Sequence, residues 1–188
     1  MFEEDLQAAL TTLRRGELIL YPTDTVWGIG CDATDYKAVA KIFRLKKRDE
    51  KKSMIVLLAD ERDIMRYVAA PDPSVFEFIK QQSRPTTVIL DDAIGLAANL
   101  ISEDGTIAIR IVQDEFCRHL IKRLQKPIVS TSANISNQQA PATFSEISKD
   151  IKRRVDYVVN WRQDDATPAQ PSRIIKWNRD GSHKVIRE

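Results

Sequence analysis

The chain has 188 residues, and its 29 lysine and arginine residues nearly balance its 27 aspartate and glutamate residues. This length suits one domain with a substantial core, and the net charge of +2 excludes a polybasic tail protein. Any binding of phosphate or nucleic acid must therefore depend on local clusters of charge. Two cysteines are too few for a disulfide scaffold. The acidic N-terminus and the lack of a long apolar run predict no signal peptide, no association with a membrane and a cytoplasmic location.

The predicted elements alternate between helices and strands. Apolar spacing predicts the helices, short apolar runs predict the strands, and Pro22 ends the first strand. In chain order we expect a helix over residues 3–15, a strand over 17–21, a polar glycine-bearing connection over 23–33, a helix capped by Asp35, a strand over 53–58, helices over 60–68 and 74–82, strands over 86–90 and 106–111, a helix capped by Asp114, a strand over 127–130, a polar loop over 131–142, a helix over 144–154, and strands over 157–160, 172–177 and 183–187. The alternation lacks strict βαβ regularity, so we expect a single α/β domain over residues 1–188, with a twisted mixed sheet flanked by helices.

A dense basic stretch joins the second helix to the strand that follows it. Residues 41–52 contain seven lysine and arginine residues against Asp49 and Glu50. The C-terminus of a helix favours positive charge, so a solvated helix end explains part of this cluster. The alternative is a set of cations held on a rigid scaffold to bind an anion.

Two further stretches have the composition of a ligand site. Thr23, Asp24 and Thr25 follow a strand, which is where α/β folds usually bind ligands. Residues 130–136 are rich in hydroxyl groups, which suits phosphate or ribose oxygens, although a polar turn alone would have the same composition. Arg110 lies inside an apolar strand and needs a carboxylate, which either a ligand or the protein could supply.

Several other chemistries are disfavoured. Residues 28–33 fit the letters G-x-G-x-x-A, but the preceding strand ends at Pro22, so we interpret the glycines as tight backbone packing and not as a dinucleotide site. The sequence contains no P-loop motif. Its two separated histidines and two separated cysteines do not have the spacing of a metal site, and a serine nucleophile would lack a suitable base.

Taken in order, these motifs resemble the YrdC family of threonylcarbamoyl-AMP synthases, in its short bacterial form without the extra C-terminal domain of a longer relative. The resemblance extends from about Leu6 to Arg187. The matching segments are residues 21–30 (YPTDTVWGIG), 46–48 (K-x-R), 106–110 (TIAIR), 126–136 (containing S-x-N), 171–174 (PSRI) and 185–187 (VIR).

The resemblance implies a YrdC-like fold with a deep basic cleft and a nucleotidyltransferase activity. Such an enzyme makes L-threonylcarbamoyladenylate from L-threonine, bicarbonate and ATP, and it releases pyrophosphate. Later proteins transfer the threonylcarbamoyl group to tRNA, which such a synthase could itself bind. Magnesium would arrive with ATP and not be held by a protein cage. The chemistry needs positioning and charge neutralisation more than a covalent nucleophile.

The resemblance also assigns residues. Catalytic roles fall on Lys46 and Arg48. The residues expected to bind ATP are Lys46, Arg48, Lys52, Thr106, Ser130, Ser132, Asn134 and Arg187. The residues expected to bind threonine are Thr25, Arg110 and Ser172.

Some segments depart from the family pattern, and two rival functions stay open. Residues 83–87, Asn137 and residues 160–165 differ from the family's usual Pro-Gly-Pro, glycine and Asp-Gly-Gly. One rival is an RNA-binding protein of the same fold that makes no adenylate, although its basic residues are not interleaved with aromatic ones. The other rival is a paralogue that carbamoylates a different amine.

Overall fold

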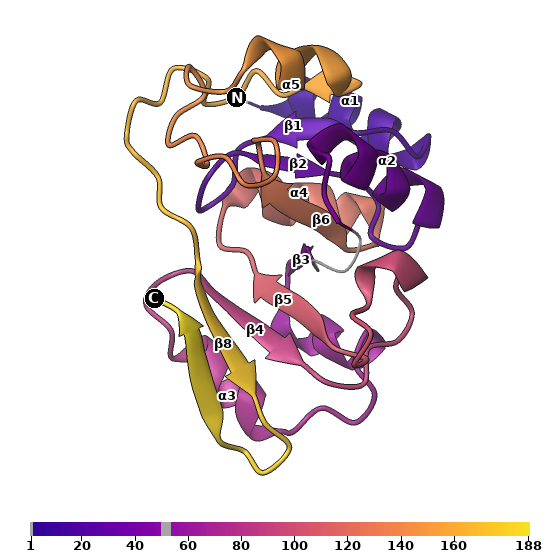
Figure 1. Ribbon diagram of the computed structural model, residues 1–188, viewed down its shortest axis with the longest axis vertical. Coiled ribbons are helices and arrows are strands. Elements are labelled where there is room, and N and C mark those ends of the chain that lie inside the picture. Colours follow the sequence, from indigo (N-terminus) through magenta and orange to yellow (C-terminus); the bar gives the residue numbers. More distant parts are fainter. Residues whose placement is uncertain (1, 50–53) are drawn as a thin grey trace.

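The computed structural model describes residues 2–49 and 54–188, and it forms a layered α/β fold (Figure 1). The helices are α1 (Glu3–Arg14), α2 (Tyr36–Lys46), α3 (Ser74–Lys80), α4 (Glu115–Leu124) and α5 (Lys149–Arg154), with the 3-10 helices η1 (Glu61–Arg66) and η2 (Ala98–Leu100). The strands are β1 (Ile19–Tyr21), β2 (Gly28–Gly30), β3 (Ile55–Leu58), β4 (Thr86–Leu90), β5 (Ile107–Ile111), β6 (Ile128–Ser132), β7 (Tyr157–Val158), β8 (Arg173–Trp177) and β9 (His183–Arg187).

One mixed sheet runs through the molecule in the order β7-β1-β2-β6-β3-β5-β4-β8-β9. Three neighbouring pairs are parallel, namely β1 with β7, β3 with β5 and β4 with β8, and the other pairs are antiparallel. The predicted α/β class with a twisted, mixed sheet is therefore confirmed. The register of β3 places Ile55 opposite both Ala108 and Ser130, so β5 and β6 lie on either side of β3.

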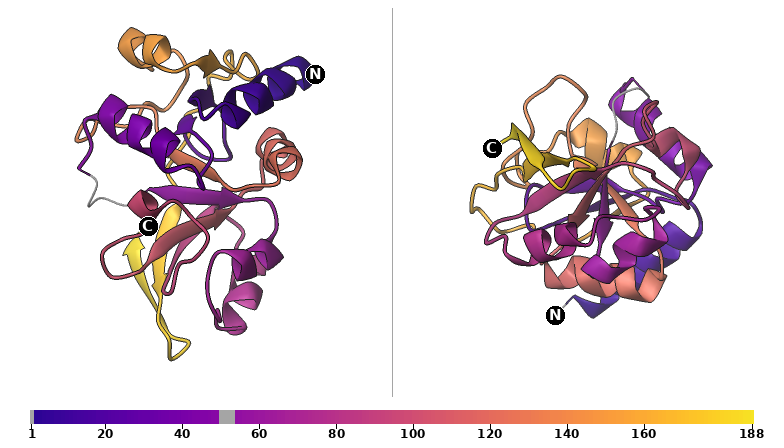
Figure 2. Two further views of the ribbon diagram at one scale, coloured as in Figure 1. Left: turned by 90° about the vertical axis from the view of Figure 1, so that its right-hand side faces the viewer. Right: turned by 90° about the horizontal axis from the view of Figure 1, so that it is seen from below.

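Helices cover both faces of the sheet, as Figure 2 shows for α2 and α4 on opposite sides. Leu6 and Leu10 of α1 pack with Phe116 and Leu120 of α4 in one buried cluster. Residues of α2, including Ile42, belong to a second and larger cluster. Removing these apolar side chains from water is the main stabilising contribution to the fold.

The two predicted helix caps are confirmed. The Asp35 carboxylate accepts hydrogen bonds from the backbone N–H groups of Lys37 (2.9 Å) and Ala38 (3.2 Å) at the start of α2. Asp114 accepts one from Cys117 N at 2.8 Å at the start of α4. Each cap satisfies donors that the first helical turn would otherwise leave unpaired.

The polar connection predicted over residues 23–33 is wrong in one respect, because it contains the short strand β2. Two of its three residues are glycines, so it lacks the apolar alternation that identifies a strand. The packing interpretation of these glycines agrees with the structure. A Cβ atom on Gly30 would lie 2.6 Å from Tyr21 Cε1 and 2.6 Å from Val129 O, and one on Gly28 would lie 3.1 Å from Ser130 Oγ.

The other differences concern the type and length of elements. The predicted helix over 144–154 is shorter and begins after Ser148, whose hydroxyl accepts from Ile151 N at 3.3 Å. Phe144 instead packs its ring 4.7 Å from that of Trp27. The segment expected as a helix over 60–68 is a 3-10 helix, the strand over 157–160 has two residues, and β6 runs two residues into the predicted loop.

Candidate functional site

A cavity of about 250 Å³ gathers residues from widely separated parts of the chain. They come from the loops that follow β1, α2 and β6, from the start of β3, from β5, β6 and β9, and from β8 and the segment before it. The lining residues are Thr25, Val26, Arg48, Met54, Ile55, Arg110, Ser130, Thr131, Ser132, Ala140, Pro171, Ser172, Ile174 and Arg187. Seven of the predicted site residues are among them.

Three guanidinium groups face this one cavity. Burial lowers the pKa of Arg48, and burial together with the charge of Arg110 lowers that of Arg187. In both groups, burial disfavours the charged form of the guanidinium. An anion bound in the cavity would relieve that cost, since an opposite charge stabilises the charged form.

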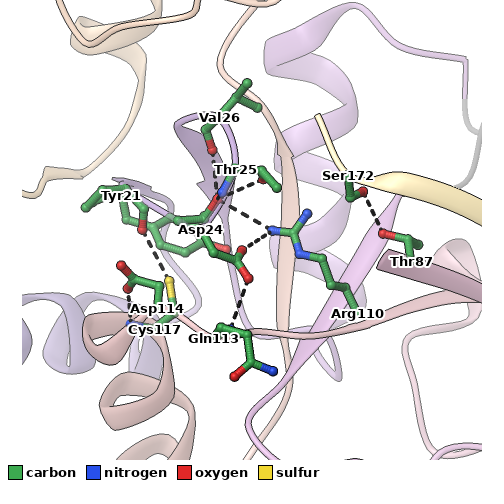
Figure 3. A network of polar contacts seen from close by, with 12 residues as sticks. Tyr21, Asp24, Thr25, Val26, Thr87, Arg110, Gln113, Asp114, Cys117 and Ser172 are labelled. Carbon is green, nitrogen blue, oxygen red and sulfur yellow. Dashed lines mark hydrogen bonds and ion pairs between the residues drawn. The ribbon is translucent and has the colours of Figure 1, made fainter. Parts of the chain in front are cut away.

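Arg110 is only 3% exposed and forms an ion pair inside the protein (Figure 3). Its Nη2 lies 3.1 Å from Asp24 Oδ1 and 3.5 Å from Thr23 Oγ1. Asp24 in turn accepts a hydrogen bond from Gln113 N at 3.0 Å. The protein therefore supplies one carboxylate to Arg110, and this pair does not exclude a second carboxylate from a ligand. The buried Arg110 Nε has no hydrogen-bond partner among the described residues, so this guanidinium retains a donor.

Hydroxyl groups extend the polar wall around Arg110. Thr25 Oγ1 lies 3.0 Å from Thr23 Oγ1, and the hydroxyl of Thr23 donates to Val26 O at 2.9 Å. Ser172 Oγ lies 2.8 Å from Thr87 Oγ1 (Figure 3). These contacts fix the orientation of side chains that would otherwise rotate freely.

Arg187 reaches the cavity from the last strand. Its Nη2 donates to Ser172 O at 2.6 Å, and its Nε donates to the same oxygen at 3.1 Å. The C-terminal strand β9 is therefore tied to the segment that precedes β8, and both contribute to the wall of the cavity.

Lys46 does not line the cavity, although the sequence predicts that it faces the phosphates. It is 1% exposed, and its ammonium group donates to Ser132 O, to Asn134 O at 2.6 Å and to Asn134 Oδ1 at 3.4 Å. Burial and the charge of Arg48 lower the pKa of Lys46 to about 7. Lys46 thus stabilises the loop that carries S-x-N, while Arg48 lines the cavity beside it.

Asn134 also turns toward its own loop. Its Nδ2 donates to Ile135 O at 3.1 Å and to Gln138 O at 2.7 Å, and its Oδ1 accepts from Ser132 Oγ. Asn134 lines a neighbouring cavity of about 370 Å³, which shares Ala140 with the first.

Thr106 is a further predicted site residue that lies apart from the cavity. Thr106 precedes β5 at the opposite end from Arg110 and donates to Asp104 Oδ1 at 2.7 Å. Lys52 lies outside the described residues.

A larger cavity of about 390 Å³ lies between other segments of the chain and contains none of the predicted site residues. Asp72, Asp91, Trp177 and Arg179 are among its lining residues. Within residues 2–49 and 54–188, no three His, Cys, Asp or Glu side chains are grouped so that they could hold a metal ion. No helix in the described part of the chain has the length and apolar character that a membrane crossing requires.

The fold and the cavity define an α/β protein with a site lined by arginine and hydroxyl side chains. The chain belongs to the Sua5/YciO/YrdC family, whose sequence model, described as "Telomere recombination", matches residues 11–188. It is 34% identical over 174 residues to the threonylcarbamoyl-AMP synthase of Idiomarina loihiensis, which covers 90% of this chain and 91% of the relative. The corresponding synthase of Pseudoalteromonas translucida is 29% identical and covers 84% of this chain and 86% of the relative. The predicted family is therefore confirmed.

Solved structures share the fold at lower sequence identity. The structure of E. coli YciO matches with a TM-score of 0.85 at 22% identity and covers 100% of this chain and 90% of that chain. The Sua5 protein of P. abyssi, solved in complex with L-threonine, also matches with a TM-score of 0.85 at 22% identity, and covers 97% of this chain and 53% of that chain.

Proposed function

We propose that the protein is an L-threonylcarbamoyladenylate synthase, a nucleotidyltransferase that uses L-threonine, bicarbonate and ATP and releases pyrophosphate. Relatives that match most of the chain are named threonylcarbamoyl-AMP synthase, and a Sua5 protein of the same fold binds L-threonine. The observation that carries the proposal is the convergence of Thr25, Arg110 and Ser172 with Arg48 and Arg187 in one cavity. These residues include predicted threonine-binding and predicted ATP-binding residues. A transfer between two substrates requires both binding sites to adjoin.

The threonine subsite is proposed at Arg110, Thr25 and Ser172. Arg110 lines the cavity, and the planar donors of its guanidinium match the geometry of an amino-acid carboxylate. The ion pair between Arg110 Nη2 and Asp24 fixes the plane of the guanidinium. The hydroxyl groups of Thr25 and Ser172 would contact the amino group or the side-chain hydroxyl of threonine.

The nucleotide subsite is proposed at Arg48, Arg187, Ser130 and Ser132, which line the same cavity. Arginine presents a planar set of donors that matches phosphate oxygens, and each charge-assisted hydrogen bond contributes about 1.5–3 kcal/mol. Lys46 and Asn134 would act by shaping the loop that presents Ser132. Direct contacts of Thr106 and Lys52 with ATP stay predictions from the family resemblance. Magnesium would enter with the triphosphate of ATP.

The proposed reaction places two anions side by side. The amine of threonine attacks the carbon of bicarbonate, and one bicarbonate oxygen leaves as water to give a carbamate. One carbamate oxygen then attacks the α-phosphorus of ATP, and the bond from that phosphorus to the bridging β-phosphate oxygen breaks to release pyrophosphate. Arg48 and Arg187 would neutralise the charge that builds on the phosphates, while Arg110 holds the threonine carboxylate. Catalysis would therefore come from alignment and electrostatic stabilisation. In the cytoplasm, the product would pass to proteins that modify tRNA.

Pyrophosphate release provides the direct test. ATP is incubated with threonine and bicarbonate, singly and together, and threonylcarbamoyladenylate is identified by mass spectrometry. Release that requires both co-substrates is the expected result. Absence of release, together with tight and salt-sensitive binding of tRNA, would instead favour an RNA-binding protein of the same fold.

Arg110→Ala tests the threonine subsite. We expect KM for threonine to rise far more than KM for ATP, because the substituted side chain faces the amino acid. Equal increases would mean that Arg110 serves only as an internal partner of Asp24.

A further inference from the structure

Arg162 lies outside the cavity but contacts two segments that shape its threonine end. Its Nη1 donates to Asp114 Oδ2 at 2.9 Å and to Thr23 O at 3.2 Å. Its Nη2 and Nε both point at Asp165 Oδ2, at 3.1 Å and 3.3 Å. One guanidinium group thus bridges the loop after β1, the start of α4 and its own turn.

The turn that carries Arg162 is anchored independently to α1. The Asp5 carboxylate accepts hydrogen bonds from Asn160 N (3.0 Å), Asn160 Nδ2 (2.9 Å), Trp161 N (2.8 Å) and the hydroxyl of Tyr157. Burial alone would raise the pKa of Asp5, but these hydrogen bonds lower it overall. The base of the turn is therefore held by an ionised carboxylate, so Arg162 extends from a fixed point.

The backbone at Arg162 adds a second observation. Its φ is 65°, in the left-handed region that a glycine adopts without strain. The sequence already departs from the family's Asp-Gly-Gly in this segment. Here an arginine occupies the left-handed position, and its long side chain reaches Thr23 O, 139 residues away in sequence.

A short series of contacts joins Arg162 to Arg110. The residue whose carbonyl accepts from Arg162 is Thr23, and its hydroxyl lies 3.0 Å from Thr25 Oγ1 and 3.5 Å from Arg110 Nη2. Asp114, a second partner of Arg162, follows directly on Gln113, whose N–H donates to Asp24 (Figure 3). Arg162 therefore ties together both segments that position the Asp24–Arg110 ion pair.

We propose that Arg162 is a positioning residue for the threonine subsite, a role that rests on the proposed synthase function. It touches no residue of the proposed nucleotide subsite in the contacts described above. Losing it would let the Thr23–Thr25 loop shift relative to Arg110, and displacements of about 1 Å can cost orders of magnitude in rate. The effect should therefore fall on threonine and leave ATP nearly untouched.

Arg162→Gly isolates the side chain, because glycine accepts the left-handed backbone that alanine would strain. We expect KM for threonine to rise about ten-fold, equivalent to about 1.4 kcal/mol, while KM for ATP changes less than about two-fold. Arg162→Lys keeps a charge but only one of the bridging contacts, so its KM for threonine should lie between those of the wild type and Arg162→Gly. Arg123→Ala, which removes an arginine paired with Glu3 between α4 and α1, is the matched control and should change neither KM.

The outcomes separate this inference from the proposed function. If the wild-type protein shows no pyrophosphate release that depends on both threonine and bicarbonate, the proposed function itself is refuted. An active wild type, with Arg162→Gly raising both KM values equally or neither, would overturn the positioning role alone. If Arg162→Gly does not fold by circular dichroism, the comparison of Arg162→Lys with the wild type decides, and an unchanged KM for threonine would again overturn it.

Discussion

Lys46→Met tests whether Lys46 of the K-x-R motif has a structural role, distinct from that of Arg48 in the cavity. Methionine keeps the apolar stem but removes the ammonium group that donates to Ser132 O and Asn134 O. Each carbonyl would lose a buried donor at a cost of about 1–3 kcal/mol. Allowing for partial access of water, we expect a total loss of about 2–4 kcal/mol in the free energy of unfolding. For a chain of this size, that corresponds to a decrease in Tm of about 5–15 °C.

The assay combines thermal unfolding with pyrophosphate release. Lys47→Met is the matched control, because Lys47 is the adjacent residue, is exposed and ends α2 with a φ of 50° that methionine would have to adopt equally. Its effect should stay within about 0.5 kcal/mol. Equal Tm values for the two variants would refute the conclusion that the ammonium group of Lys46 holds the S-x-N loop.

Three further predictions concern the glycines of β2, Arg48 and the protonation of Lys46. Gly30→Ala should lower the free energy of unfolding by about 1–3 kcal/mol, because the new Cβ would overlap the ring of Tyr21 and a backbone carbonyl of β6. Gly28→Ala should lower it less, since its Cβ has more room. Chemical denaturation measures both values, and equal stability of the two variants would contradict the prediction. Arg48→Ala should abolish pyrophosphate release and leave the circular dichroism spectrum unchanged, and an active variant would exclude the phosphate role. The pKa of Lys46 is about 7 in the folded state, below its ordinary value of 10.5, so between these values the unfolded chain binds a proton that the folded chain has lost. The free energy of unfolding of the wild type should therefore rise with pH relative to that of Lys46→Met, by up to about 1.4 kcal/mol per pH unit. If the free energies of unfolding of the two proteins change in parallel with pH, the lowered pKa of Lys46 is contradicted.

Much of the candidate site could be predicted from the sequence because its chemistry is local. A cationic helix end, a hydroxyl-rich loop after a buried strand and an arginine inside an apolar strand can each be identified from composition and spacing. Their order along the chain also identified the family. Among the predicted residues, Thr25, Arg48, Arg110, Ser130, Ser132, Ser172 and Arg187 do line one cavity.

The sequence could not show which side chain faces which partner. Lys46 and Arg48 are two residues apart at a helix end, yet one donates to the carbonyls of a distant loop and the other lines the cavity. The sequence left the partner of Arg110 open, and the structure assigns Asp24, which lies in the loop after β1. Arg162 offered no motif at all, because Thr23 and Asp114, the partners that link it to the site, lie far from it in sequence.

The sequence by itself determined the order and type of most elements, the helix caps at Asp35 and Asp114, and the supply of cations and hydroxyl groups. These features depend on neighbours a few residues away, through helical spacing, capping and turn chemistry. Only the tertiary structure decided that Lys46 supports the loop of Asn134 and that Arg110 keeps one donor without a partner among the described residues. The physical reason is that the direction of a buried polar side chain depends on which acceptors the packed sheet brings within about 3 Å, and those acceptors come from strands and loops distant in the chain.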